Sequence, residues 1–258
     1  MQNNLYKLAC VLAGLTLQGN AIAAVPLAKN TLYMCEYKSN SSLYKINPSN
    51  GAATLVGPTQ TSLQCTDLTF RGTTLLGSAF TKLLTIDPTT GKATPKSKPY
   101  GGSITDINAL VTQPSTNKLF GAGSNSPGRF VQINPTSGVA TQLGTFGTGL
   151  GSAGDLAFLN GVLYATLTNA ADTRATYLAK ISLVSPTIGK ATLIGPIRRT
   201  VNGKTVYLQN VWGLAVRNNV LFGAMLTGEV LTINPNNAVA TLKGDNNKQQ
   251  AGLAVSPP

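Results

Sequence analysis

Five copies of one hairpin pattern constrain the fold of this chain more than any other feature. In each copy a short apolar strand ends at Ile, a turn carries Asn or Asp, Pro and Gly, and a return strand begins with Ala-Thr. The turn residues suit this role because Asn or Asp bonds the backbone ahead, Pro fixes φ, and Gly supplies a left-handed residue. The sequence therefore predicts five β-hairpins, which begin at Leu43, Leu83, Phe130, Leu178 and Val230.

Two copies depart from the pattern. The fourth is longer, because it carries additional residues between Ile181 and Gly189. The fifth has Ala238 where the other copies have Gly. We expect the neighbouring Asn237 to take the left-handed conformation in that turn, because Asn adopts it more readily than other non-glycine residues.

A second apolar pattern precedes or follows the hairpins as short strands. We align these strands so that one position is shared by Asp67, Asn108, Asp155, Gly213 and Gly252. All but the last lead through a brief turn to a further apolar strand, so each full unit holds four strands. Four strands are the content of one β-propeller blade.

The two ends of the chain complete each other. The chain ends on an inner strand, 252–255, that has no hairpin after it, and its first hairpin has no inner strand before it. The sequence thus predicts an all-β fold, a β-propeller of five four-stranded blades closed by a blade split between the N- and C-termini. Closure of this kind removes exposed sheet edges. An open solenoid is the alternative, but it needs polar caps and the half-units here are apolar.

The hairpin motif, Leu-Tyr-x-Ile-[Asn/Asp]-Pro-x-[Thr/Ser]-Gly-x-Ala-Thr, together with Gly-Leu-Ala-Val, resembles the repeats of secreted bacterial β-propeller proteins. Many of those proteins belong to uncharacterised families. The resemblance covers nearly all of the chain after residue 24 and implies the architecture. It implies little about function, because propellers serve as lectins, hydrolases, lactonases and docking platforms alike.

The first residues have the composition of a signal peptide. Lys7 precedes an apolar run, 8–17, and small residues follow at 20–24. Cys10 stands at the start of the apolar run rather than after it, which argues against a lipid attachment site. We expect residues 1–24 to be removed and 25–258 to form a single exported domain, secreted or periplasmic. No other stretch is apolar for long enough to predict a transmembrane segment.

Two cysteines remain after that cleavage, Cys35 and Cys65. In an exported protein the simplest expectation is one disulfide between them. Two small buried thiols are the alternative.

The chain contains no His, which argues against a zinc site and against a Ser-His-Asp triad.

In a propeller, the connections from each outer strand to the next inner strand share a face with those between the second and third strands. The long connections predicted here all belong to these two sets, and we call this side the long-loop face. Variable loops on a constant scaffold are where binding usually occurs. The connections concerned are 58–66, 96–107, 145–154 and 196–211 in one set, and 122–129 and 168–177 in the other.

Carboxylates and an amide are expected at the channel mouth of this face, from Asp67, Asp106, Asn108 and Asp155. Such a group could hold Ca²⁺ or bind sugar hydroxyls. The alternative is that these side chains cap backbone groups where strands begin. A hydrolase or lyase acting on sugars or lactones would use the same carboxylates, but glycoside hydrolysis needs a carboxyl pair and neither Glu36 nor Glu229 lies on an inner strand. No cofactor besides Ca²⁺ is indicated.

Basic residues dominate the charge, which is +12 for the whole chain and +11 without Lys7. A basic face attracts anionic partners, although it can also serve solubility alone. With 6% aromatic residues the chain lacks a stacking platform for nucleic acid. We predict a non-enzymatic module that binds an anionic glycan or a protein partner, with a structural envelope protein as a further alternative. The candidate residues on the long-loop face are Arg129, Arg174, Arg198, Arg199, Lys204, Tyr207 and Trp212.

Overall fold

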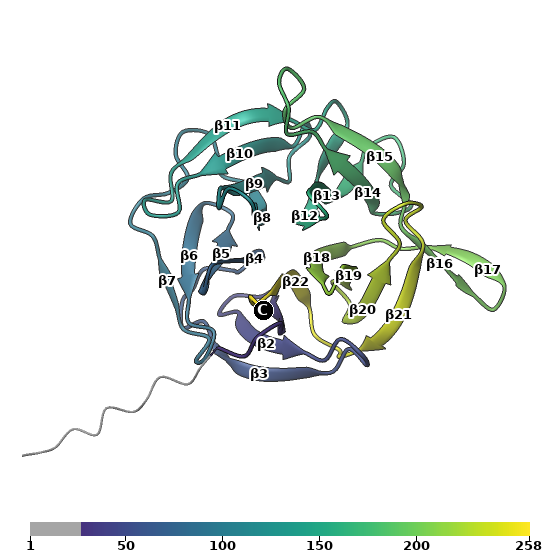
Figure 1. Ribbon diagram of the computed structural model, residues 1–258, viewed down its shortest axis with the longest axis horizontal. Coiled ribbons are helices and arrows are strands. Elements are labelled where there is room, and N and C mark those ends of the chain that lie inside the picture. Colours follow the sequence, from purple (N-terminus) through teal and green to yellow (C-terminus); the bar gives the residue numbers. More distant parts are fainter. Residues whose placement is uncertain (1–26) are drawn as a thin grey trace, which may run out of the picture.

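The computed structural model describes residues 27–258, and the predicted signal peptide, 1–24, lies outside the described residues. Every helix or strand element within 27–258 is a β-strand. Five antiparallel four-stranded sheets stand around a central axis like the blades of a propeller (Figure 1). The predicted five-bladed β-propeller is therefore confirmed.

Four blades are built from consecutive strands, with the first strand of each nearest the axis (Figure 1). Blade 2 contains β4 (Asp67–Arg71), β5 (Thr74–Ala79), β6 (Lys82–Ile86) and β7 (Ala93–Pro95). Blade 3 contains β8 (Ile107–Thr112), β9 (Leu119–Gly123), β10 (Arg129–Ile133) and β11 (Ala140–Thr145). Blade 4 contains β12 (Leu150–Leu159), β13 (Val162–Asn169), β14 (Tyr177–Ile181) and β15 (Ala191–Pro196). Blade 5 contains β18 (Val211–Arg217), β19 (Val220–Met225), β20 (Glu229–Ile233) and β21 (Ala240–Asp245).

Blade 1 closes the ring and draws its strands from both ends of the described chain. Its inner strand is β22 (Gln250–Val255), which pairs antiparallel with β1 (Leu32–Glu36). The two outer strands are β2 (Ser42–Ile46) and β3 (Ala53–Pro58). Closure by a split blade was predicted from the complementary half-units, and it leaves no gap in the ring.

Neighbouring blades are held together by buried apolar side chains. Five separate clusters account for the core, one at each of the five interfaces between adjacent blades. Between blades 3 and 4, for example, Phe130 and Leu167 are fully buried in the same cluster. Because each blade is fixed on both sides, the strand ends at the channel mouth stand on a rigid support.

The hairpin turns follow the predicted chemistry, with one correction. Gly51 has a φ of 72° and donates its backbone N–H to the carbonyl of Asn47, and Ala238 does the same to Asn234 with a φ of 58°. The left-handed residue is thus Ala238 itself, and the prediction that Asn237 would take this role was wrong. The turn's hydrogen bond fixes which position is left-handed, so the strain stays at that position whatever residue occupies it.

The alignment of the inner strands also needs a correction. The ladder to the second strand of each blade makes five leucines equivalent: Leu68, Leu110, Leu156, Leu214 and Leu253. The residue before Leu110 is Ala109, so Ala109 and not Asn108 corresponds to Asp67. Asn108 lies one residue before the equivalent position, at a β-bulge between Ile107 and Ala109.

Cys35 and Cys65 form the predicted disulfide, with Cα atoms 6.2 Å apart. The bond joins β1 of blade 1 to the segment that leads into β4 of blade 2. Both cysteines are fully buried in the apolar cluster between those blades. The alternative of two separate thiols is therefore excluded in this structure.

A small hairpin outside the five blades was not predicted. It consists of β16 (Arg198–Val201) and β17 (Lys204–Tyr207), and it extends outward from the rim of the ring between β15 and β21 (Figure 1). We call it the rim hairpin. Within residues 27–258, no helix is long and apolar enough to cross a membrane.

Candidate functional site

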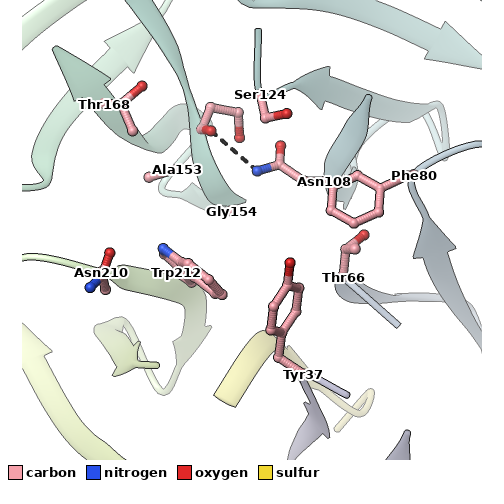
Figure 2. Close-up of a pocket in the computed structure, with 11 residues that line it drawn as sticks. Tyr37, Thr66, Phe80, Asn108, Ser124, Ala153, Gly154, Thr168, Asn210 and Trp212 are labelled. Carbon is pink, nitrogen blue, oxygen red and sulfur yellow. Dashed lines mark hydrogen bonds between the residues drawn. The ribbon is translucent and has the colours of Figure 1, made fainter. Parts of the chain in front are cut away.

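A pocket of about 330 Å³ opens at the end of the central channel where the inner strands begin (Figure 2). We call it the mouth pocket. Its volume is at the low end of the roughly 300–1,000 Å³ typical of small-molecule sites. All five blades contribute to its wall. The lining residues are Tyr37, Thr66, Phe80, Asn108, Ser124, Ser152, Ala153, Gly154, Thr168, Asn210 and Trp212.

Three aromatic side chains from three different blades form one part of the wall (Figure 2). Tyr37 follows β1, Phe80 follows β5, and Trp212 lies in β18 at a bulge. The rings of Tyr37 and Trp212 meet edge to face, with centroids 4.8 Å apart and an interplanar angle of 77°. Phe80 has a φ of 46°, a left-handed backbone that is unusual for a bulky residue. Strained residues of this kind cluster at ligand sites.

Polar side chains lie between and across from the aromatic ones, with Asn108 and Ser124 across the pocket from Tyr37 (Figure 2). The Asn108 amide donates a hydrogen bond from Nδ2 to the Ser152 carbonyl at 3.1 Å, which fixes its orientation. Asn108 is 8% exposed and Ser152 is 2% exposed. Neither Asn108 Oδ1 nor Ser152 Oγ has a hydrogen-bond partner within the described part of the chain. Buried polar atoms are normally paired, and these two have almost no accessible surface, so a ligand reaches them only if a side chain of the pocket wall moves.

None of the residues that line the mouth pocket is charged. Two ionic side chains near it are already paired. Arg129 forms an ion pair with Asp106 at 3.1 Å, and Lys38 forms one with Glu36 at 2.7 Å. Asp106 also accepts a hydrogen bond from the backbone N–H of Asn125 at 3.1 Å. The pocket therefore offers aromatic faces, amides and hydroxyl groups rather than ions.

Two buried carboxyl groups, Asp67 and Asp155, close the channel below the mouth pocket, and we call them the carboxyl plug. Both residues are 0% exposed. Asp67 accepts the backbone N–H of Leu68 at 2.6 Å and that of Leu110. The two aspartates between them accept five amides, one from each blade.

Asp155 accepts the remaining three amides of this set. Its partners are the N–H groups of Leu156 at 2.6 Å, Leu214 at 2.6 Å and Leu253 at 3.0 Å. These five leucines are the equivalent residues of the five inner strands, whose N–H groups face the axis and have no further strand to pair with. The carboxyl plug thus provides a hydrogen-bond acceptor for the inner edge of every blade. Of the two interpretations open from the sequence, the capping role holds for Asp67 and Asp155.

The carboxyl plug keeps a proton that exposed aspartates lose. Burial raises the pKa of both carboxyl groups well above the usual range. In Asp67 the nearby charge of Asp155 raises the pKa further, and the hydrogen bond between the two groups favours the proton on Asp67. One shared proton avoids two adjacent buried negative charges.

Glycine at one equivalent position makes room for the carboxyl plug. A Cβ atom on Gly252 would lie 1.9 Å from Asp67 Oδ1 and 2.4 Å from Asp67 Cα. No side chain can stand there without moving the aspartate. The glycine at position 252 is therefore a packing requirement of Asp67, which the sequence pattern alone did not explain.

The predicted carboxylate site is only partly assembled. The structure brings Asp67 and Asp155 together, but Asp106 is engaged by Arg129 and Asn108 lies in the mouth pocket. Among residues 27–258 no three His, Cys, Asp or Glu side chains cluster as ligands for a metal ion. The two plug carboxyls are occupied by backbone amides, so the arrangement gives little support to Ca²⁺ binding or to carboxylate catalysis.

Most of the predicted basic residues lie together, but away from the channel. Arg198, Arg199, Lys204 and Tyr207 lie on the rim hairpin, away from the channel. Arg174 forms two hydrogen bonds to Asp172, each 2.9 Å long, and its guanidinium lies 5.2 Å from the centre of the Tyr207 ring.

Of the predicted site residues, only Asn108 and Trp212 line the mouth pocket. Sequence reasoning missed Tyr37, Phe80 and Ser152. None of the three belongs to a repeated motif. The one available signal was their place in connections next to the inner strands.

Compared with known proteins, the chain matches no family model and no curated protein. The strand order and register thus carry the assignment of the fold. Because propeller folds support many functions, the function has to be argued from the chemistry of the mouth pocket.

Proposed function

We propose that this protein is an exported, non-enzymatic binding module that holds part of a glycan in the mouth pocket. The observation that carries the proposal is the mixed wall, in which the rings of Tyr37 and Trp212 lie across the pocket from the amide of Asn108 and Phe80 lies beside that amide. Sugar rings combine apolar C–H faces with hydroxyl groups around the edge. A pocket of aromatic faces and a few fixed polar groups is suited to both.

The rigidity of the site favours binding. Its residues come from five blades that are locked by apolar clusters and by the closed ring. A site that is already formed pays little ordering entropy when a ligand enters. Two of its polar atoms are buried without partners, and a side-chain movement that opens them to a ligand adds hydrogen bonds that the free protein lacks.

Export is supported by the disulfide together with the predicted signal peptide at 1–24. Disulfides persist in oxidising compartments and are rare in the reducing cytosol. Both features agree with the secreted proteins that the repeats resemble. We therefore place the protein in the periplasm or outside the cell.

Binding is preferred over catalysis because no free pair of carboxyl groups flanks the mouth pocket. Asp67 and Asp155 are buried and accept five backbone amides, while Asp106 is neutralised by Arg129. A glycoside hydrolase needs one carboxyl group as an acid and another as a base or nucleophile beside the substrate. A sugar-directed hydrolase or lyase is the alternative that this geometry favours less.

A glycan array with two tyrosine variants tests the proposal. Tyr37→Ala removes an aromatic face of the mouth pocket, and we expect binding of the best glycan to weaken at least tenfold. Tyr207→Ala removes a tyrosine of the rim hairpin and serves as the matched control, with binding within about twofold of wild type. Thermal unfolding of both variants verifies that they fold. The proposal fails if no glycan binds, or if Tyr207→Ala abolishes binding while Tyr37→Ala does not. Release of shortened sugars from the bound glycan would contradict the non-enzymatic role.

A further inference from the structure

We infer that the bound group is a single uncharged sugar ring, presented as a chain end or a side branch. This inference rests on the proposed function and names the class of ligand for the same pocket. It departs from the anionic glycan expected from the sequence. Three features of the mouth pocket carry it: the lack of charge in its wall, its closed base, and the kind of polar atom that lacks a partner.

The lack of charge disfavours an anionic ring. No Lys or Arg lines the pocket, and the ionic groups at its margin, Arg129 and Lys38, are paired with Asp106 and Glu36. A buried anion without a cationic partner pays a large desolvation cost. The cations of the rim hairpin lie too far from the mouth pocket to offset this desolvation cost.

The closed base limits what can enter. A second cavity of about 190 Å³ lies at the other end of the channel, lined by Leu68, Thr69 and Phe70 and their equivalents. Asp67, Asp155 and Leu68 separate the two cavities and are at most 1% exposed. A polysaccharide cannot thread through such a channel. With a volume of about 330 Å³, the mouth pocket suits one ring of a chain that ends or branches there.

The unpaired polar atoms select hydroxyl groups over carboxylates. Asn108 Oδ1 is an acceptor, and its Nδ2 is already bound to the Ser152 carbonyl. A sugar hydroxyl can donate to Oδ1 or accept from the Ser152 hydroxyl once a side-chain movement opens the buried atom to the pocket. A carboxylate only accepts, so it would leave the Asn108 oxygen unpaired and repel it. The aromatic wall opposite would then cover the apolar face of the ring.

Fluorescence of Trp212 provides a direct test, because it is the one tryptophan of the chain and lies in the pocket wall. The mature protein is titrated with matched methyl glycosides, galactose against galacturonic acid and glucose against glucuronic acid, and calorimetry repeats each titration. We expect the best neutral sugar to bind at least tenfold more tightly than its uronic acid. Its affinity should not change between about 50 and 500 mM NaCl, since salt screens only charged partners.

Two variants connect the result to the pocket. Asn108→Leu keeps the side-chain size but removes the acceptor Oδ1, and we expect it to weaken the affinity for the neutral sugar at least tenfold. The double variant Arg199→Gln/Lys204→Gln removes rim-hairpin cations and should leave that affinity within about twofold. This inference is overturned if a uronic acid binds as tightly as the neutral sugar, or if it binds more tightly and its affinity falls in high salt. Either result leaves the proposed function standing. If no sugar of either kind gives a fluorescence change or heat, the proposed function itself is overturned.

Discussion

Two successive positions of the five inner strands differ in character although they are one residue apart. The first position holds Thr66, Asn108, Gly154, Trp212 and Ala251, and four of these five line the mouth pocket. The next position holds Asp67, Ala109, Asp155, Gly213 and Gly252, where two aspartates bind the amides of all five strands. The first layer varies in size and polarity, whereas the second contains only Asp and small residues.

The comparison teaches how a symmetric scaffold supports an asymmetric site. Five equivalent backbone N–H groups need acceptors on the axis, and two carboxyl groups with small neighbours meet that need in little space. The side chains of the layer above do not have to accept backbone N–H groups in this way, so they are free to form a pocket. Substitutions in the lower layer should therefore affect stability, and those in the upper layer should affect binding.

The largest effect is expected from Asp155→Ala. It leaves three buried amides, those of Leu156, Leu214 and Leu253, without an acceptor. At roughly 1–3 kcal/mol for each unpaired group, the free energy of unfolding should fall by about 5 kcal/mol. Urea unfolding measures this loss. Asp245→Ala, at an exposed carboxylate, is the control and should cost less than about 1 kcal/mol. A loss below 1 kcal/mol for Asp155→Ala would show that the lower layer does not hold the ring.

Removal of the disulfide is expected to have the next largest effect. The bond lies next to the wall of the mouth pocket. Cys35 precedes Tyr37 by two residues and Cys65 adjoins Thr66, so the bond ties together two parts of the mouth pocket. For a sequence separation of 30 residues, its loss should cost about 3–4 kcal/mol through the entropy of the unfolded chain. Urea unfolding of Cys35→Ser/Cys65→Ser should agree with that of reduced wild type. Equal midpoints for oxidised and reduced protein would refute the expected contribution.

A pair of glycine variants sharpens the packing side of the comparison. In Gly252→Ala the new Cβ would meet Asp67 Oδ1, and we expect the free energy of unfolding to fall by about 2–3 kcal/mol. Gly72→Ala is the control, because its Cβ would meet nothing within 4 Å and only its φ of 57° opposes the change. Its cost should be about 1 kcal/mol. Similar losses of unfolding free energy in the two variants would mean that the contact with Asp67 does not contribute to the effect of Gly252→Ala.

The smallest effect expected is a dependence on pH. Because the pKa of Asp67 is raised in the folded state, the folded protein keeps a proton that the unfolded chain releases above about pH 4. The free energy of unfolding should therefore rise as the pH falls from 7 to 5, by at most about 1.4 kcal/mol per pH unit. The chain has no His to titrate in this window. The pKa values of Asp87 and Asp172 are lowered by their hydrogen bonds, so their stabilisation is lost only below about pH 4.

Asp67→Asn is the matched variant for the pH series, because its amide mimics the protonated acid and cannot titrate. Urea unfolding at pH 7 and 5 should show little change in this variant. A wild type that loses stability on going from pH 7 to 5, or a variant with the same dependence as wild type, would contradict the shared proton.

The repeats predicted most of the fold, because turn residues and strand pattern act locally. They also predicted the split blade, whereas the disulfide was predicted from the two cysteines of an exported chain. The alignment of Asn108 with Asp67 was wrong, because the leucine shared by the inner strands, Leu110, follows Ala109. The rim hairpin was missed because 198–207 lies in a connection that belongs to no repeat.

The candidate site was harder to predict than the fold. Asn108 and Trp212 were identified, but Tyr37 and Phe80 lie in short connections that come together only when the ring closes. The sequence places the cations of the rim hairpin in one long connection next to Trp212, and this predicts that they share a face with it. The strand pairing of β16 with β17 separates them from the channel.

The most direct test of the account is a crystal structure of the mature protein soaked with the sugar that binds most tightly. We predict one ring in the mouth pocket, with its apolar face against Tyr37 or Trp212 and a hydroxyl on Asn108 Oδ1. The carboxyl plug should be unchanged beneath it. Sugar found on the rim hairpin or at the lower end of the channel, with the mouth pocket free of it, would contradict the account.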